Sequence, residues 1–417
     1  MDRITYYQVR LTQKSPLRIS AGLGEQTDSD VIRDRRGLPF IPGSSLAGLL
    51  REEFDSLTAD RLFGYIRKNG ETQESRLLVS DAVLPNDTKV RISRRDGVGL
   101  NERKTAIRGA KYDFEVVESD TPYVAVLELR DPDYTHELEA VLDRWIALGV
   151  SVGARTTRGY GSMDVGIRKR AFSIPGELDA WLDFDPFVEG AFQNCQDRSA
   201  SDAKADGMLI LRAALTMDGS YSVRMNTSAL AQAGDRVVPD TVPMENRLGD
   251  PVVPGTSWAG AFRHHMRALA QDCGLGEQAM NEIDALFGVG GGKEKSRSAI
   301  RFSETDVKDS KRMTVTRTAI ERYTAAPRNR ALFTSQVAVG GGGELVITLP
   351  ANTSDLLKGL LGVTLCDMNF GLLGFGGENG IGRGSAIITE LTVNGIERTD
   401  ELRAGDVTGL WKEETVC

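Results

Sequence analysis

The feature that most constrains the fold of this chain is an internal repeat of its own sequence. Residues 28–51 align without a gap with residues 240–263: both segments begin with Asp and end in G-x-P-x-[IV]-P-G-[ST]-S-x-A-G-x-x-R. Two further features recur in the same order, an L-F-G segment at 62–64 and 286–288 and a glycine-rich loop at 155–162 and 374–385. Because ordered self-similarity indicates repeated structural units, we interpret the chain as a tandem duplication.

The length of 417 residues fits two domains of about 200 residues each. Between the two halves, the sequence becomes small, polar and without hydrophobic periodicity, which is typical of a linker. We therefore expect a first module at residues 1–195, a linker at 196–205 and a second module at 206–417.

Each half has the same expected order of strands and helices. An alternating apolar pattern at 4–12 and 208–217 predicts a half-buried first strand. After the Pro-Gly turn, apolar residues at helical spacing predict a helix over 44–57, with Ser44 or Ser45 as its N-cap, and its counterpart begins at Thr256 or Ser257. Further helices are predicted at 137–148 and 354–370. The order favours an α+β fold of two tandem ferredoxin-like modules, an architecture that RNA recognition motifs share.

Composition excludes several classes of protein. The net charge of -8 argues against coating naked nucleic acid by bulk electrostatics. No apolar run approaches the length of a membrane span and the amino terminus lacks a signal-peptide core, so we expect a cytoplasmic protein.

Four scattered cysteines and three histidines favour neither a disulfide framework nor a His-rich metal site, so a metal would have to bind carboxylates. Glu294 stands where a P-loop needs Ser or Thr, which excludes a P-loop nucleotide triphosphatase.

Several repeated features are candidate phosphate contacts. The Pro-Gly-[ST]-Ser turn at a helix start offers free backbone N–H groups, although a plain capped turn has the same pattern. The glycine-rich loops would let a nucleic-acid strand come close to the backbone. The candidate residues at the turns and loops are Ser44, Ser45, Arg51, Thr256, Ser257, Arg263, Arg155, Arg158 and Arg383.

A basic segment also occurs at the same place in each half. Residues 91–111 and 308–330 each contain seven basic and two acidic side chains, a net charge of +5. A solvated charged loop would have this composition, but its recurrence favours a phosphate-contacting arm. The candidates on these arms are Arg94, Arg95, Lys104, Arg108, Arg317, Arg322 and Arg328.

Taken in order, the Asp-containing loop, the Pro-Gly-Ser-Ser turn, the L-F-G segment, the basic insertion and the closing glycine-rich loop resemble the RAMP superfamily. The similarity is to the backbone subunits of type III CRISPR effector complexes and covers most of both halves. It implies a ferredoxin-like palm, thumb hairpins at 91–114 and 308–333, and a loop aspartate required for target cleavage, here Asp28 and Asp240. The implied partners are crRNA, complementary target RNA and other effector subunits.

The resemblance also implies an endoribonuclease chemistry. An aspartate beside a displaced nucleotide would hold a divalent cation, Mg²⁺ or Mn²⁺, or help to deprotonate a ribose 2′-hydroxyl. Asp30 and Asp34 lie near enough in sequence to share that metal or to replace Asp28. In the family, the residue after Pro-Gly-Ser-Ser-Leu in this turn is usually basic. This chain has Ala47 at that position in the first repeat and Ala259 in the second. Two alternatives stay open: a non-catalytic crRNA-binding scaffold, and a guide-processing ribonuclease, which the scarcity of histidine disfavours.

Overall fold

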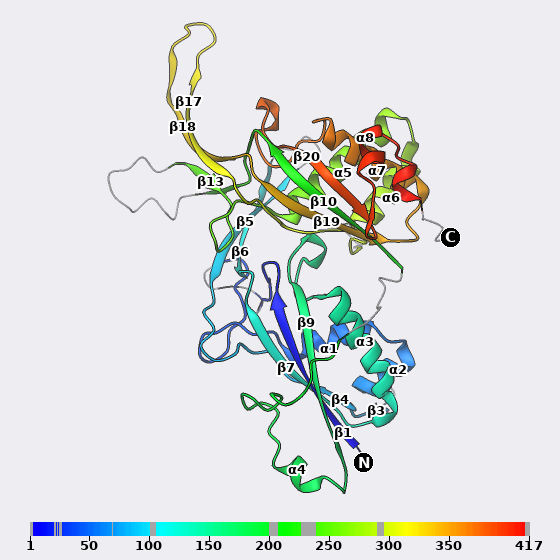
Figure 1. Cartoon of the computed structure of the whole chain (residues 1–417). Coiled ribbons are helices and arrows are strands. Elements are labelled where there is room, and N and C mark those ends of the chain that lie inside the picture. Colours follow the sequence, from blue (N-terminus) through cyan, green and yellow to red (C-terminus); the bar gives the residue numbers. More distant parts are fainter. Residues whose placement is uncertain are drawn as a thin grey trace. The chain divides into compact units, whose positions relative to one another are not determined.

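The computed structural model describes residues 3–412 except 21, 23, 25, 26, 69, 101–105, 200–206, 227–238 and 290–295. The chain, traced in Figure 1, divides into two compact units. The first unit comprises Met1–Arg94, Asp113–Thr156 and Tyr160–Asp206, and the second comprises Arg95–Tyr112, Thr157–Gly159 and Gly207–Cys417. Two short segments of the first repeat therefore belong to the compact unit that the second repeat forms.

A five-stranded antiparallel sheet organises the first unit. Its strands lie in the order β4 (Leu77–Val79), β7 (Pro122–Leu129), β1 (Arg3–Gln13), β9 (Ser162–Ser173) and β8 (Val150–Ser151). Helices α1 (Gly43–Glu52), α2 (Ser56–Phe63) and α3 (Thr135–Leu148) cover one face.

The central strand of this sheet shows why both faces are covered. Along β1, Tyr7 and Val9 enter the main hydrophobic cluster with the helices, while Ile4 and Tyr6 point to the opposite face. Successive side chains of a strand point to opposite faces, so each face receives its own apolar set. The segment around α4 (Leu178–Leu182) covers the second face and contributes Phe192.

The second unit repeats this arrangement. Its strands lie in the order β15 (Arg301–Phe302), β19 (Gly342–Pro350), β10 (Met208–Asp218), β20 (Ser385–Val393) and β21 (Ile396–Glu397). Its helices are α5 (Gly255–Asp272), α6 (Gly276–Phe287), α7 (Asp355–Asn369) and α8 (Thr399–Ala404). In both units the first strand of the repeat is central and pairs antiparallel with both neighbours. The predicted fold of tandem ferredoxin-like modules is thereby confirmed.

A two-stranded hairpin is inserted into each repeat, where the sequence predicted a basic arm. The first hairpin pairs β5 (Ile92–Leu100) with β6 (Ala106–Val117), and the second pairs β17 (Lys311–Ile320) with β18 (Pro327–Val339). In Figure 1 the second hairpin, in yellow, extends away from the sheet of its unit. The base of β18 also joins β11 (Ser220–Tyr221) and β13 (Thr241–Pro243), and β13 pairs with β12 (Arg224–Asn226).

Short elements complete the described chain. The small strands are β2 (Tyr65–Ile66), β3 (Thr72–Gln73), β14 (Val252–Val253) and β16 (Thr305–Asp306). The 3-10 turns are η1 (Pro132–Tyr134), η2 (Thr156–Arg158), η3 (Asn379–Ile381) and η4 (Gly409–Trp411). Among the described residues, no helix is long and apolar enough to cross a membrane.

The helix after each Pro-Gly turn begins earlier than the sequence predicted. Helix α1 starts at Gly43 with Pro42 as its N-cap, so the assignment of Ser44 or Ser45 as N-cap is wrong. The reason lies in the glycine: a Cβ on Gly43 would stand 2.4 Å from the carbonyl oxygen of Val79, and one on Gly255 would stand 2.3 Å from that of Phe302. The repeated glycine therefore lets each helix start against the neighbouring strand.

The chain still contacts the first unit beyond residue 195, where the first module was expected to end. Arg198 donates to Asp143 at 2.5 Å and to Glu139 at 2.9 Å, both on α3. Asp197 forms a β-bridge with Arg168 on β9. The expected linker comprised residues 196–205. Asp197 and Arg198 of that segment contact the first unit, and residues 200–205 lie outside the described part of the chain.

Candidate nucleic-acid interface

The loop that carries Asp28 is fastened to the return strand of the first hairpin. The backbone N–H of Asp28 donates to Oδ1 of Asp113 at 2.9 Å, and the N–H of Asp113 donates to Oδ2 of Asp28 at 3.0 Å. Asp28 is exposed, whereas Asp113 is half-buried on β6 and forms an ion pair with Arg94. The aspartate loop and the base of the hairpin are therefore one connected structure.

Asp240 occupies the equivalent place in the second repeat. Its backbone N–H donates to the carbonyl oxygen of Thr334 at 2.7 Å, and the N–H of Thr334 donates to Oδ2 of Asp240 at 2.8 Å. Thr334 lies on β18, the return strand of the second hairpin, and Asp240 is exposed. Both aspartates thus contact the base of their own hairpin. Among the described residues, the partner of Asp28 brings a second carboxylate, that of Asp113, whereas the partner of Asp240 is the backbone of Thr334.

The two other aspartates of the first loop hold turns together. Oδ1 of Asp30 accepts hydrogen bonds from the backbone N–H and the hydroxyl of Thr27, at 2.9 and 2.7 Å. Asp34 accepts from the backbone N–H groups of Arg36 and Leu38. The Leu38 N–H and the Arg36 guanidinium lower the pKa of Asp34. Within the described residues, no three His, Cys, Asp or Glu side chains form a group that would hold a metal.

At the helix starts, the predicted phosphate contacts differ in their surroundings. Ser44 is exposed, and Ser45, Thr256 and Ser257 are half-buried. The first backbone N–H of α1, that of Gly43, already donates to Oδ1 of Asp81 at 2.7 Å. A carboxylate therefore stands where a phosphate would bind the start of α1, an arrangement that sequence patterns alone did not reveal.

The repeated arginine after the turn has the same internal partners in both repeats. Arg51 donates to Asp60 at 2.5 Å and to the carbonyl oxygen of Gly64 at 3.1 Å. Arg263 donates to Asp284 at 2.7 Å and to the carbonyl oxygen of Gly288 at 3.2 Å. These contacts link the helix to the following L-F-G segment, and they explain why the arginine and that segment recur together.

The arginines of the glycine-rich loops are also engaged. Arg155 has φ of 62° and its guanidinium lies 5.4 Å from the ring centre of Phe114, which Arg18 also approaches, at 4.4 Å. Arg383 is buried and pairs with Glu378. Within the second unit, Arg158 donates to the carbonyl oxygen of Phe287 at 3.3 Å.

The basic arms contain the most accessible cations of the predicted set. Arg108, Arg322 and Arg328 are exposed, and Arg328 pairs with Glu321 at 3.0 Å. Arg317 is half-buried and pairs with Glu378 at 3.5 Å. Lys104 lies outside the described residues.

The surroundings of two residues on these arms were not predicted from the sequence. Arg95 is buried in the second unit, where it donates to both carboxylate oxygens of Glu304, at 2.5 and 3.2 Å. Tyr323, at the tip of the second hairpin, is 91% exposed beside Arg322. An aromatic residue within a basic arm is a recognisable signal for base stacking, and it could have been found in the sequence.

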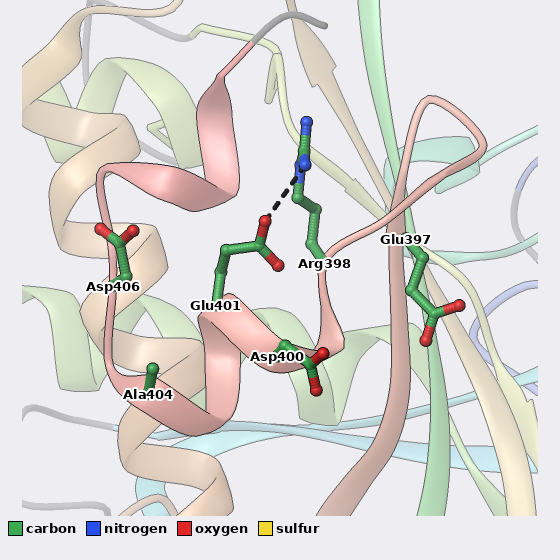
Figure 2. A pocket seen from close by; sticks show the side chains of 6 residues that line it. All are labelled: Glu397, Arg398, Asp400, Glu401, Ala404 and Asp406. Atoms are coloured by element: carbon green, nitrogen blue, oxygen red, sulfur yellow. Dashed lines mark hydrogen bonds and ion pairs between the residues drawn. The ribbon is translucent and has the colours of Figure 1, made fainter.

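A hollow near the C-terminal end offers a different chemistry. It is lined by Glu397, Arg398, Asp400, Glu401, Ala404 and Asp406 (Figure 2). The single cation, Arg398, pairs with Glu401 at 3.2 Å, and four carboxylates make up most of the polar lining. Because a phosphate backbone is repelled by carboxylates, this hollow is a poor RNA site.

Comparison with known families identifies the two repeats. A model described as the RAMP superfamily matches residues 10–164 and again residues 213–387. The two matched regions correspond to the two repeats and together cover most of the chain. No curated protein matches the sequence.

Proposed function

Because the chain belongs to the RAMP superfamily, whose members are CRISPR-associated RNA-binding proteins, we propose that it is a backbone subunit of a type III CRISPR effector complex. In this proposal the chain holds crRNA, together with neighbouring effector subunits, and cuts the target RNA that pairs with the guide. Pairing supplies the sequence specificity, so the protein contacts the ribose-phosphate backbone.

One observation carries the proposal of cleavage. Asp28 and Asp240 are exposed, and each is held against the return strand of a basic hairpin by two hydrogen bonds, in one of which its carboxylate accepts from a backbone N–H of that strand. In both loops, at the same position of the repeat, the aspartate carboxylate accepts a hydrogen bond from a backbone N–H of the return strand. An RNA strand that follows either hairpin would therefore pass the carboxylate at the base of that hairpin.

The residues present fit a divalent cation. Mg²⁺ in phosphate chemistry commonly takes one or two protein carboxylates, with phosphate and water as the other ligands. Asp28 and Asp113 would hold the ion in the first repeat, and Asp240 would do so in the second. When bound, the ion withdraws electron density from the scissile phosphate.

The carboxylate itself supports a simple cleavage step. A loop aspartate within hydrogen-bonding reach would accept the proton of a ribose 2′-hydroxyl. The 2′-oxygen then forms a bond to the adjacent phosphorus while the bond from phosphorus to the 5′-oxygen breaks, and water protonates the leaving 5′-oxygen. The products would be a 2′,3′-cyclic phosphate and a 5′-hydroxyl.

The test uses the assembled complex, labelled target RNA and Mg²⁺. We expect Asp28→Asn and Asp240→Asn each to remove one product band, and the double variant to remove both. Asparagine keeps an oxygen that accepts the backbone N–H, so the loops stay attached while the charge is lost. Unchanged products from the double variant would overturn the proposal of cleavage.

A second candidate function is a crRNA-binding scaffold without catalysis. It is favoured by the observation that both carboxylates already accept hydrogen bonds from the hairpin backbone, which is a structural role in itself. If this function is correct, the asparagine variants will bind guide and target RNA with wild-type affinity and leave cleavage unaltered.

A further inference from the structure

The segment around α4 is attached by aromatic side chains to the outer face of the first sheet, the face opposite α1, α2 and α3. The ring centre of Phe184 lies 5.2 Å from that of Phe172 and 5.6 Å from that of Phe192. Trp181 of α4 donates from its indole nitrogen to the hydroxyl of Tyr6 at 3.0 Å. One side of the segment is thus fixed against the sheet, so it keeps its conformation before any partner binds.

The other side of this segment exposes apolar side chains. Leu178 and Leu182, one turn apart on α4, are 39% and 65% exposed. Phe187 and Val188, in the turn that follows, are 70% and 57% exposed. Single exposed apolar residues are common on proteins, but a concentration of them is typical of a binding surface. Together these four residues form the α4 surface.

The same segment is strongly acidic. Residues 171–196 contain five carboxylates and no lysine or arginine, a net charge of -5. Asp179 and Asp183 are exposed next to Leu178 and Leu182. The other three carboxylates are Glu177, Asp185 and Glu189. This charge repels RNA and anionic membrane surfaces, whereas it attracts lysine and arginine side chains.

The equivalent face of the second sheet is polar where that of the first is apolar. On the first sheet, Ile4 and Tyr6 of the central strand pack under the α4 segment. On the second sheet, Arg212 of the central strand pairs with Glu344 of β19 at 2.9 Å, and the two side chains are 58% and 50% exposed. The α4 surface is therefore a feature of the first repeat and is not imposed by the repeated fold.

We propose that the α4 surface binds a basic amphipathic helix of a partner protein. The spacing of Leu178 and Leu182 by one helical turn matches the i, i+4 spacing of apolar side chains on such a helix. Those side chains would cover the α4 surface, and flanking lysines or arginines would pair with the carboxylates. A second copy of this chain fits poorly, because two molecules of net charge -8 repel each other. The proposal does not rest on RNA binding or cleavage.

Fluorescence anisotropy with a labelled helical peptide tests the proposal. The probe has about five turns, with leucine along one face and lysine along the other, and a comparison peptide carries glutamate in place of lysine. We expect the purified chain, free of RNA, to bind the lysine peptide saturably within about 1 to 100 µM and not to bind the glutamate peptide. No saturable binding of the lysine peptide in this range, or equal binding of both peptides, would refute the proposal.

Matched variants locate the contact. Leu182→Ser should weaken binding of the lysine peptide by about tenfold, because an apolar contact is lost. Leu57→Ser is the control and should leave the affinity unchanged, since Leu57 is also 65% exposed but lies on α2. Asp183→Asn should make the affinity less dependent on salt, whereas Asp400→Asn, in the hollow near the C-terminal end, should not. Equal effects of the two serine variants would contradict binding at the α4 surface.

Two further measurements separate this contact from others. A carbodiimide joins carboxylates directly to lysines, so it should crosslink the peptide to residues 177–189, and crosslinks found only at 397–406 would place the contact elsewhere and refute the proposal. Circular dichroism verifies that each variant is folded. Sedimentation velocity of the chain alone detects self-association, and association that Leu182→Ser removes would assign the α4 surface to a second copy in place of the proposed partner.

Discussion

At the scale of single residues, the strongest sequence matches between the repeats turn out to serve the fold. The pattern places an arginine in the helix that follows the Pro-Gly turn and an Asp four residues before the L-F-G glycine, and these two side chains pair in both units. Gly43 and Gly255 recur because a side chain there would collide with a neighbouring strand. These residues recur because of their contacts within each module and not because they contact RNA.

Removing the repeated arginine should therefore affect stability more than RNA binding. Arg51→Ala leaves the Gly64 carbonyl oxygen and the Asp60 carboxylate without this donor, and we expect unfolding to become easier by about 1 kcal/mol. Urea denaturation measures the change, with Arg36→Ala on an exposed turn as the control. A loss of RNA affinity with unchanged stability would contradict this assignment.

A second prediction at this scale concerns the stability of the fold at low pH. Burial raises the pKa of Glu139, but its hydrogen bonds to Lys169 and Tyr7 and the charge of Arg198 outweigh that effect and lower it. A lowered pKa in the folded state means that the ionised carboxylate stabilises the fold above its ordinary pKa of about 4.3, and that this stabilisation is lost as pH falls through the folded-state value.

Glu139→Gln should thus lower the melting temperature at pH 7, and the difference from wild type should shrink as the pH drops below about 4. Thermal denaturation followed by circular dichroism across that range tests this. Glu137→Gln, exposed on the same helix, is the control and should show little difference at any pH. A Glu139→Gln difference that grows in acid would refute the assignment.

At the scale of elements, the hairpins contribute exposed positive charge that the overall acidic composition conceals. The second hairpin presents Arg322, Arg328 and Arg330 near its tip, all exposed. Its base is fixed by the long pairing of β17 with β18 and by the contact with the Asp240 loop. A rigid base and a charged tip are suited to positioning a phosphate backbone.

Replacing the tip arginines one at a time should lower the affinity for guide RNA. It should also make that affinity less dependent on the salt concentration. Each lost phosphate contact reduces the slope of log affinity against log salt by about 0.7 for a single strand. Fluorescence anisotropy at several salt concentrations measures the slope for Arg322→Ala and Arg330→Ala. Arg212→Ala, an exposed arginine on β10, should leave it unchanged, and an equal effect of all three would indicate unspecific electrostatics.

At the scale of the whole molecule, the duplication was the most informative element of the sequence. Order and spacing were enough to predict two ferredoxin-like modules, a basic arm in each, and equivalent positions for Asp28 and Asp240. The resemblance to the RAMP superfamily implied that each arm is a hairpin. Contacts between residues distant in sequence were not predictable in this way. The partner of Arg95 is Glu304, more than two hundred residues away, and the carboxylate at the start of α1 comes from Asp81.

The same limit applies to the difference between the two aspartate loops. Asp113 and Thr334 lie on hairpin strands whose register the sequence does not fix, so the extra carboxylate in the first repeat became visible only in the structure. It suggests a concrete asymmetry: the product band that depends on Asp28 should appear at lower Mg²⁺ concentration than the band that depends on Asp240. A titration of cleavage against Mg²⁺ measures both, and identical midpoints would contradict the asymmetry.

The claim on which these functional proposals depend is that both hairpins lie along the bound RNA. Ultraviolet crosslinking of the complex with guide RNA, followed by mass spectrometry, locates the contacts directly. We predict crosslinked peptides from residues 106–117 and 320–333 and none from the acidic hollow at 397–406. Crosslinks confined to that hollow, or absent from both hairpins, would contradict the claim.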